Sequence, residues 1–239
     1  MLVGHFDIVG AGPEEVEVLV LKDADARGDE RMELAVGAAA VGLELVFAWP
    51  QAVDAVRSPD VSGISTVTAT LMVLVGLSWL AYGVGVADPM VIVANLVMLS
   101  ATLVIAGALA RRRALAWRAT ATVVAVWALA IAAATVVWGT TGPAVVGSIV
   151  GIGMGVPQAV HAVRSGSVAG VAISSYVLLA LLQGTWLLYG VLVGDAVIVV
   201  PNVIALPVSL GVLGILVRGR ATAPPPPRHR AGDFDMVES

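Results

Sequence analysis

The chain has 239 residues, of which 59% are hydrophobic and 13% are charged, and its formal net charge is -4. An ordinary soluble domain carries about 25% charged residues, so this composition excludes a soluble globular protein and predicts a membrane protein. The sequence contains no cysteine, which excludes disulfides and thiolate metal sites.

Seven apolar runs follow one another along the chain, each near the roughly 20 residues that a helix needs to cross a bilayer. A β-barrel would need alternating polar and apolar residues, whereas runs such as "VVAVWALAIAAATVVW" are apolar on every face. The sequence therefore predicts an all-α membrane protein with seven transmembrane helices. These helices are expected at residues 34–56, 61–87, 89–110, 119–138, 143–163, 168–194 and 196–217.

The segment before the first run is acidic and lacks the basic-then-apolar start of a secretory signal. Two interpretations are open. Residues 1–31 form a loosely ordered extension, or the assigned start is too early and Met32 is the true first residue.

A sequence repeat links the two halves of the chain. "WPQAVDAVRS" at 49–58 returns as "VPQAVHAVRS" at 156–165, a displacement of 107 residues. The same offset matches about 20 of the 46 positions from Pro50 to Asn95, including Trp, Tyr, Asp and Asn. Matching polar residues are not explained by two helices being similarly apolar, so this is an internal repeat of three helices.

Basic residues predict the orientation, because arginines in short loops mark the cytoplasmic side. With seven crossings, all the arginines from Arg57 onward fall on one side, while the opposite loops contain no Lys or Arg. The N-terminus is therefore expected outside and the C-terminus in the cytoplasm, although Lys22, Arg27 and Arg31 disagree. The expected location is the plasma membrane.

The fourth run has no partner in the repeat. Three crossings reverse the chain direction, so one extra helix is needed to make the two units parallel. The prediction is two parallel three-helix bundles joined by a linker helix, an architecture in which transporters bind substrate between the repeats. The predicted boundaries are 33–111 for the first repeat, 118–139 for the linker, 143–218 for the second repeat and 219–239 for a Pro-rich cytoplasmic tail.

Each repeat contains a Pro-Gln pair near the predicted cytoplasmic end of its first helix. A proline inside a helix removes a backbone hydrogen bond and bends the helix, and the neighbouring amide can occupy the freed groups. A static kink is one interpretation. Duplication favours the other, an inner-gate hinge formed by Pro50 and Gln51 with Pro157 and Gln158.

Trp79 and Asn95 in the first repeat correspond to Trp186 and Asn202 in the second, and both pairs are predicted at similar depth. An asparagine in the membrane must find hydrogen-bond partners, so one interpretation is a clasp between helices. The favoured interpretation is a sugar site, because an indole face suits the C–H face of a sugar and an amide suits its hydroxyls.

The Pro-Gln repeat, the segments "SWLAYGVGVAD" and "TWLLYGVLVGD", and the 16-residue Trp-to-Asn spacing resemble the SWEET sugar transporters and their half-sized bacterial relatives in the PQ-loop superfamily. The resemblance covers residues 33–218. It implies bidirectional facilitative transport of mono- or disaccharides by alternating access, with the matching Trp and Asn residues in the sugar pocket. It also implies an outer gate at Tyr82, Asp88, Tyr189 and Asp195.

Val86 and Val193 stand where some bacterial relatives have an arginine, so this chain lacks that partner for an outer salt bridge. Residues 62–86 and 169–193 also lack the prolines of plant members. Glu44 is the only acid predicted in mid-membrane, and its repeat mate is Gly151. Glu44 is either a proton site or a protonated hydrogen-bond donor.

The alternative function is a PQ-loop exporter of amino acids or other small solutes, proton-coupled through Glu44; a cargo receptor that binds without transporting is also open. No catalytic constellation, cofactor, metal or nucleic-acid partner is expected, and the triplet Gly151, Gly153 and Gly155 is interpreted as close helix packing. The expected partners are a sugar and the lipid bilayer. Association of chains is open but is not required to form the pore.

Overall fold

The computed structural model describes the backbone of residues 13–58, 65–112, 116–165 and 173–222, and the side chains of residues 26–58, 65–112, 116–154 and 173–218. Every regular element within these ranges is helical, which confirms the predicted all-α class. The elements are α1 (Pro13–Arg57), α2 (Thr66–Val86), α3 (Pro89–Arg111), α4 (Trp117–Trp138), the 3-10 turn η1 (Gly139–Thr141), α5 (Gly142–Ser165), α6 (Ile173–Leu192) and α7 (Ala196–Thr222).

Six segments of the described chain are long and apolar enough to cross a membrane. One of them, Trp117–Met154, has 38 residues and runs through α4, η1 and the first half of α5. This is close to twice the length of one crossing. The chain turns within it at Gly139, whose φ of +60° is readily adopted by glycine. The predicted seventh crossing thus depends on the division of this segment at η1.

Helix α1 begins about twenty residues earlier than expected. Residues 13–31, predicted as a loosely ordered extension, continue the helix of the first apolar run. The sequence explains this difference. Pro13 suits the first helical position, and Glu14 and Glu15 favour a helix N-terminus. Between Pro13 and Met32, Gly28 is the only strong helix breaker.

The helix ends follow local capping chemistry. Helix α2 starts five residues later than predicted, because the Ser65 hydroxyl accepts from the backbone N–H of Thr68 at 3.3 Å and caps it. The Asp88 carboxylate caps α3 by accepting from Met90 N at 2.8 Å, and Asp195 caps α7 by accepting from Val197 N at 2.8 Å. The two repeated aspartates therefore have the same structural role at equivalent turns.

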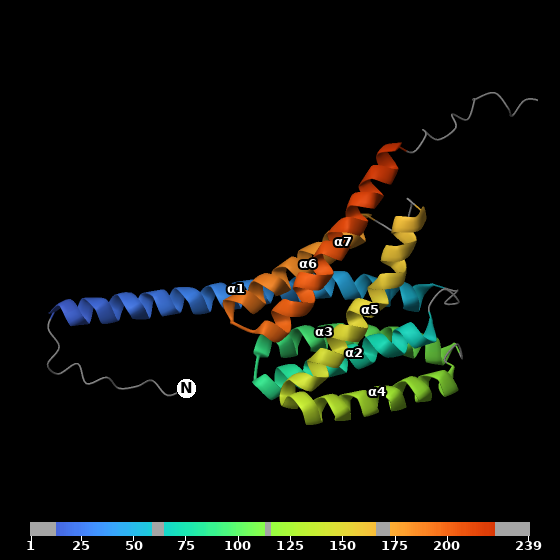
Figure 1. Cartoon of the computed structure of the whole chain (residues 1–239), viewed down its shortest axis with the longest axis horizontal. Coiled ribbons are helices and arrows are strands. Elements are labelled where there is room, and N and C mark those ends of the chain that lie inside the picture. The colour runs from blue at the N-terminus through green and yellow to red at the C-terminus, as the bar shows by residue number, and fades with distance from the viewer. Residues whose placement is uncertain (1–12, 59–64, 113–115, 166–172, 223–239) are drawn as a thin grey trace, which may run out of the picture.

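Six helices form a closed ring. Around the ring, α1 packs on α3, α3 on α2, α2 on α5, α5 on α7, α7 on α6, and α6 returns to α1. Helix α4 lies outside the ring against α2 and α5 (Figure 1). The indole Nε1 of Trp127 donates to Ser78 Oγ at 3.1 Å, and this buried bond fastens α4 to α2. The unpaired fourth helix is therefore held on one side of the ring.

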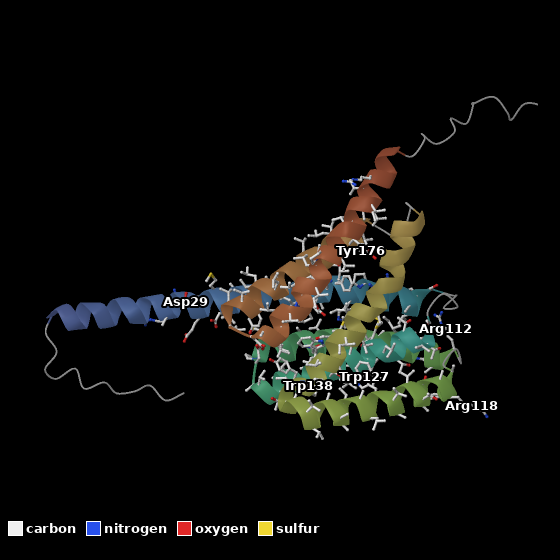
Figure 2. The ribbon with its side chains drawn as sticks, viewed as in Figure 1. Asp29, Arg112, Arg118, Trp127, Trp138 and Tyr176 are labelled. Atoms are coloured by element: carbon white, nitrogen blue, oxygen red, sulfur yellow. The ribbon has the colours of Figure 1, made fainter. Side chains whose placement is uncertain are left out.

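The outward faces of the helices are apolar. On α4, for example, Val136 is 87% exposed and Leu129 is 72% exposed. Soluble monomers rarely expose contiguous apolar surface of this kind, so these faces require lipid. Figure 2 shows Arg112 and Arg118 at one end of the helices and Trp138 near the other. We call the first the arginine end, and the end with the turns at Asp88 and Asp195 the aspartate end.

Among the described side chains, the two halves of the ring share a core at the aspartate end. Tyr82, Val91, Ala144, Tyr189 and Ile198 form one buried cluster that draws on both repeats. Toward the arginine end, each half has its own cluster: Ala52, Ala101 and Leu109 belong to the first and Tyr176, Val212 and Leu216 to the second. Figure 1 shows α5 and α7 running obliquely to α2, α3 and α4, with their C-terminal ends away from these helices. The described side chains thus join the halves at the aspartate end and form separate clusters toward the arginine end.

Candidate functional site

A cavity of about 410 Å³ lies inside the ring. Its lining is paired by the repeat, because nine pairs of lining residues are separated by 107 positions. They are Glu44 and Gly151, Met72 and Leu179, Val75 and Leu182, Gly76 and Gln183, Trp79 and Trp186, Val91 and Ile198, Ala94 and Pro201, Asn95 and Asn202, and Met98 and Ala205. The repeat in the sequence therefore surrounds a single cavity with equivalent positions from both halves.

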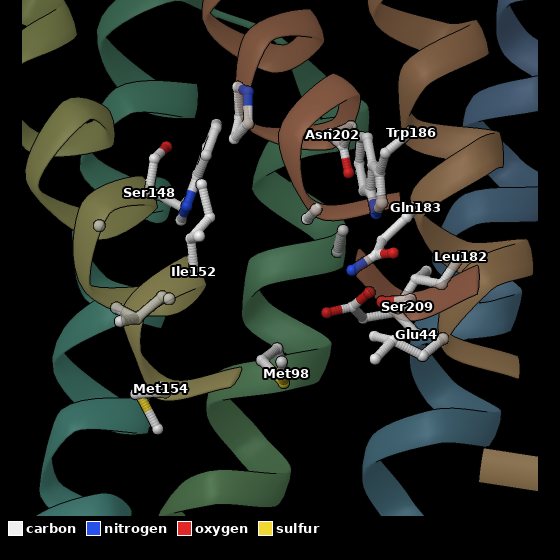
Figure 3. A pocket seen from close by; sticks show the side chains of 18 of the residues that line it. Glu44, Met98, Ser148, Ile152, Met154, Leu182, Gln183, Trp186, Asn202 and Ser209 are labelled. Atoms are coloured by element: carbon white, nitrogen blue, oxygen red, sulfur yellow. The ribbon is translucent and has the colours of Figure 1, made fainter. Parts of the chain in front are cut away.

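All four residues predicted to bind substrate line this cavity. Trp79 and Trp186 come from α2 and α6, and Asn95 and Asn202 come from α3 and α7. Figure 3 shows Trp186 and Asn202 on the same wall of the cavity. The structure thus brings together residues that are up to 123 positions apart.

Within the described part of the chain, the asparagines form no hydrogen bond to a neighbouring helix. Asn95 Nδ2 donates to Val91 O and Asn202 Nδ2 donates to Ile198 O, each at 2.8 Å and each within its own helix. An amide has a second N–H and two acceptor lone pairs. These remain for a ligand in the cavity, an arrangement that suits hydroxyl groups.

The four predicted outer-gate residues form a reciprocal pair of hydrogen bonds at the aspartate end. The Tyr82 hydroxyl donates to Asp195 Oδ2 at 2.5 Å, and the Tyr189 hydroxyl donates to Asp88 at 2.9 Å. Each tyrosine therefore binds the aspartate of the other repeat. None of the described residues adds a cation to these bonds, in agreement with valine at positions 86 and 193. The two halves are therefore connected here by tyrosine–aspartate hydrogen bonds and not by a salt bridge.

Each tryptophan of the cavity contacts a tyrosine of this closure. Trp79 meets Tyr82 edge-to-face with ring centroids 5.8 Å apart, and Trp186 meets Tyr189 in the same way at 5.6 Å. Residues three apart on a helix share a face, so the Trp-x-x-Tyr spacing produces this contact in both repeats. A molecule that displaces the indoles would also act on the closure.

Small residues allow the helices to approach at this end. A Cβ added to Gly37 would lie 3.0 Å from Tyr189 Cε2. The repeat mate of Gly37 is Ala144, which is fully buried in the cluster containing Tyr82. A Cβ on Gly147 would lie 3.2 Å from Trp79 Cδ1. These contacts hold the aromatic residues in place from the neighbouring helix.

Polar residues that sequence reasoning missed occupy one wall of the cavity. Gln183 and Ser209 line it beside Glu44 (Figure 3). Glu44 is buried and accepts a hydrogen bond from the Trp186 side chain. Gln183 could have been found from the sequence, because it is an amide in an apolar helix and its repeat mate is a glycine. The same asymmetry drew attention to Glu44.

Two of the four predicted hinge residues, Pro50 and Gln51, do not line the cavity. Pro50 and Gln51 are exposed on α1, which continues as helix to Arg57. The Gln51 side chain therefore faces outward beside the proline. Pro157 and Gln158 fall inside α5, where the side chains lie outside the described residues. Sequence reasoning missed a proline that does line the cavity, Pro201 on α7.

The interpretation of the glycine triplet in α5 as close helix packing is wrong for its first two members. A Cβ on Gly151 would meet no atom closer than Val75 Cγ1 at 4.0 Å, and a Cβ on Gly153 would meet nothing within 4 Å. Gly151 faces the cavity instead of a neighbouring helix. The side chain of Gly155 is outside the described residues.

Comparisons with known proteins agree with this geometry. Residues 141–215 match the family described as "Sugar efflux transporter for intercellular exchange". No curated protein matches the chain significantly. Among solved structures, the chain is similar to a eukaryotic SWEET transporter, with a TM-score of 0.63 and 19% sequence identity over 80% of this chain and 99% of that one.

The resemblance inferred from the repeat is therefore confirmed, over residues 141–215 by the family model and at the level of the fold by the similar structure. The matched segment contains α5, α6 and most of α7, the second of the two repeated units. Residues 141–215 are thus similar to a family of sugar efflux transporters, and the fold of the chain is similar to that of a SWEET transporter.

Proposed function

We propose that this protein carries mono- or disaccharide sugars across the plasma membrane by facilitated diffusion, with alternating access to one cavity. The observation that carries the proposal is the cavity itself, where paired Trp and Asn residues from the two repeats surround the same space. Indole faces and amides together suit a ring with apolar C–H faces and polar hydroxyls. The matching family and the similar structure are both described by sugar transport or by the SWEET name.

The proposed topology has seven crossings as two parallel three-helix bundles with α4 as linker. Division of the 38-residue segment at η1 supports the seventh crossing, and the contacts of α4 outside the ring support its role as linker. The arginine end is then cytoplasmic and the aspartate end is outside. The N-terminus lies outside, the C-terminus lies in the cytoplasm, and the ring needs no second chain to enclose its cavity.

The arrangement corresponds to an inward-facing state in this topology. The Tyr–Asp hydrogen bonds and the shared core close the outer end, whereas each half has its own core toward the inner end. Rocking of one bundle against the other would break the outer contacts and close the inner end. A substrate that binds against Trp79 and Trp186 would influence this step through Tyr82 and Tyr189.

Uptake by proteoliposomes tests the proposed function. With labelled sugars and amino acids offered in parallel, we expect the wild-type protein to equilibrate sugars in both directions without an energy source. A proton ionophore should leave counterflow of sugar unchanged. Uptake of amino acids alone, or accumulation driven by an imposed pH gradient and lost in Glu44→Gln, would instead support the proton-coupled exporter.

The repeated Pro-Gln motif gives a further expected result, because restored hydrogen bonds should straighten the helices. In Pro50→Ala and Pro157→Ala, we expect turnover to fall severalfold while sugar affinity changes much less, since Trp79, Asn95 and their mates lie on other helices. Turnover and equilibrium binding are measured for both single variants and the double variant. Unchanged turnover in the double variant would show that the motif is only a packing device.

A further inference from the structure

The cavity is paired in position but not in chemistry. Two of its nine pairs join a polar residue to a glycine: Glu44 to Gly151, and Gln183 to Gly76. Glu44 and Gln183 lie on α1 and α6, which pack together, and the two glycines lie on α5 and α2, which also pack together. One wall of the cavity therefore carries an acid and an amide, and the equivalent positions across the pseudo-twofold axis carry no side chain.

The polar wall has hydrogen-bonding capacity to spare. Gln183 Oε1 is buried and has no hydrogen-bond partner among the described residues. Glu44 accepts from Trp186, which leaves other lone pairs of its carboxyl group free for a ligand. Figure 3 shows Glu44, Gln183 and Ser209 gathered on this wall. Because an unpaired buried acceptor is costly, this wall calls for a ligand that donates hydrogen bonds.

Both glycine positions have room for a methyl group. A Cβ on Gly76 would meet no atom closer than Leu99 Cδ1 at 3.7 Å, and for Gly151 the nearest atom lies at 4.0 Å. These are ordinary van der Waals separations, so the two helices could pack equally well with alanine here. The glycines leave a hollow that faces the polar wall across the cavity.

No cation lines the cavity within the described residues, and Glu44 and Tyr176 are its only titratable lining groups. A ligand that supplies several neutral donors on one side and an apolar face on the other suits these two walls. Adjacent hydroxyl groups on a sugar ring have this chemistry. Two acceptors on neighbouring helices can each accept a hydrogen bond from one of these adjacent hydroxyl groups.

We propose that Glu44 and Gln183 form a hydroxyl-recognition subsite, which holds a neutral sugar in one orientation and off the pseudo-twofold axis. The inference rests on the proposed sugar transport and deepens it. Gln183 Oε1 accepts a hydrogen bond from one hydroxyl group of the sugar, and the Glu44 carboxyl group forms a hydrogen bond with the adjacent hydroxyl group. The sugar ring extends toward the hollow at Gly76 and Gly151. The repeat gives the cavity two equivalent halves. Because Glu44 and Gln183 have no polar mates in the other half, the ligand binds in one of the two otherwise equivalent orientations.

Equilibrium binding of deoxy sugars tests the subsite. Wild-type protein in lipid nanodiscs is titrated with glucose, each monodeoxyglucose and glucosamine, and compared with Gln183→Leu, Glu44→Leu and Glu44→Gln. Loss of one recognised hydroxyl should weaken wild-type binding about tenfold or more. Gln183→Leu and Glu44→Leu should each lose discrimination at one ring position and keep it at the others. Glu44→Gln should keep it, because an amide oxygen still accepts.

Thr185→Val on α6 serves as the matched control. Its hydroxyl donates to Leu181 O on an exposed face and does not line the cavity, so its binding profile should equal that of the wild type. Retained discrimination at the other ring positions shows that each leucine variant is folded. Gly151→Ala and Gly76→Ala should weaken sugar binding severalfold at unchanged thermal stability, because the added methyl group fills the hollow without a clash.

The contrary outcomes separate the subsite from the transport function. If every variant keeps the wild-type deoxy-sugar profile, the subsite is wrong and sugar transport stands. If the wild-type protein binds no sugar, the proposed function itself fails. If glucosamine binds more strongly than glucose and this preference is lost in Glu44→Gln, the ligand of the subsite is a cation and not a neutral sugar. Equal loss of proton-driven uptake in Glu44→Gln and Glu44→Leu, with an unchanged sugar profile, would make Glu44 a proton carrier.

Discussion

Alanine at both Asn95 and Asn202 is expected to lower sugar uptake about a hundredfold or more in a protein that still folds and inserts. Each substitution leaves sugar hydroxyls without a partner in a largely dry cavity, at a cost of about 1–3 kcal/mol, and 1.4 kcal/mol corresponds to a factor of ten. Among the described residues, the amides bond within their own helices, to Val91 O and Ile198 O. Their removal therefore breaks no described hydrogen bond between helices.

Initial uptake rates and binding affinities are compared for the two single variants, the double variant and Ser100→Ala. Ser100 is the matched control because its hydroxyl also donates to a backbone carbonyl of α3, Val97 O at 2.7 Å, but it does not line the cavity. Each single variant should lose about tenfold, and the control should transport normally. Wild-type uptake in the double variant would refute the assignment of the cavity as the sugar site.

Phenylalanine at both Tyr82 and Tyr189 is expected to open the aspartate end and shift the protein out of the proposed inward-facing state. The substitution removes only the two hydroxyls that cross between the repeats and leaves both rings in the shared core. Hydrogen bonds to charged groups contribute about 1.5–3 kcal/mol each. Loss of two of them would change the ratio of the two states by more than a hundredfold.

The absence of cysteine allows this shift to be measured directly, because single cysteines can be introduced without a background. Spin labels at Val84→Cys and Val191→Cys, two exposed positions related by the repeat, report the separation of α2 and α6. The double phenylalanine variant should show a longer distance distribution than the parent. Tyr176→Phe, at the other end of α6, should not. An unchanged distance would mean that packing of the cluster, and not the hydroxyls, closes this end.

Both aspartates should be left in place in this experiment. Asp88 and Asp195 also cap α3 and α7, so their replacement would cost helix stability, about 1 kcal/mol for each cap. A loss of transport in an aspartate variant could then come from the lost helix cap or from the lost tyrosine–aspartate hydrogen bond. The tyrosine variants separate the closure from the caps because only the hydroxyl is removed.

Several features of the protein could be predicted from the sequence for clear physical reasons. A bilayer accepts only helices or closed barrels, so the apolar runs predicted the all-α class. A repeat in constant register places equivalent residues at equivalent positions, so the 107-residue offset predicted that Trp79, Trp186, Asn95 and Asn202 would share one site. Polar residues in apolar helices are costly, and for that reason Glu44 stood out before its position in the cavity was known.

Other features depended on how the two halves pack. The sequence places Tyr82 six residues before Asp88, but the structure pairs it with Asp195 of the other repeat, because the aspartate ends of the halves meet across the ring. Gly151 suggested close packing and instead lines the cavity. Gln183 gained significance only when α1 and α6 placed it beside Glu44 (Figure 3). Local sequence thus determined the helices, their caps and the paired positions. Only the tertiary structure decided which contacts cross between the repeats and where Glu44 and Gln183 come together, because these depend on how the two repeats pack against each other.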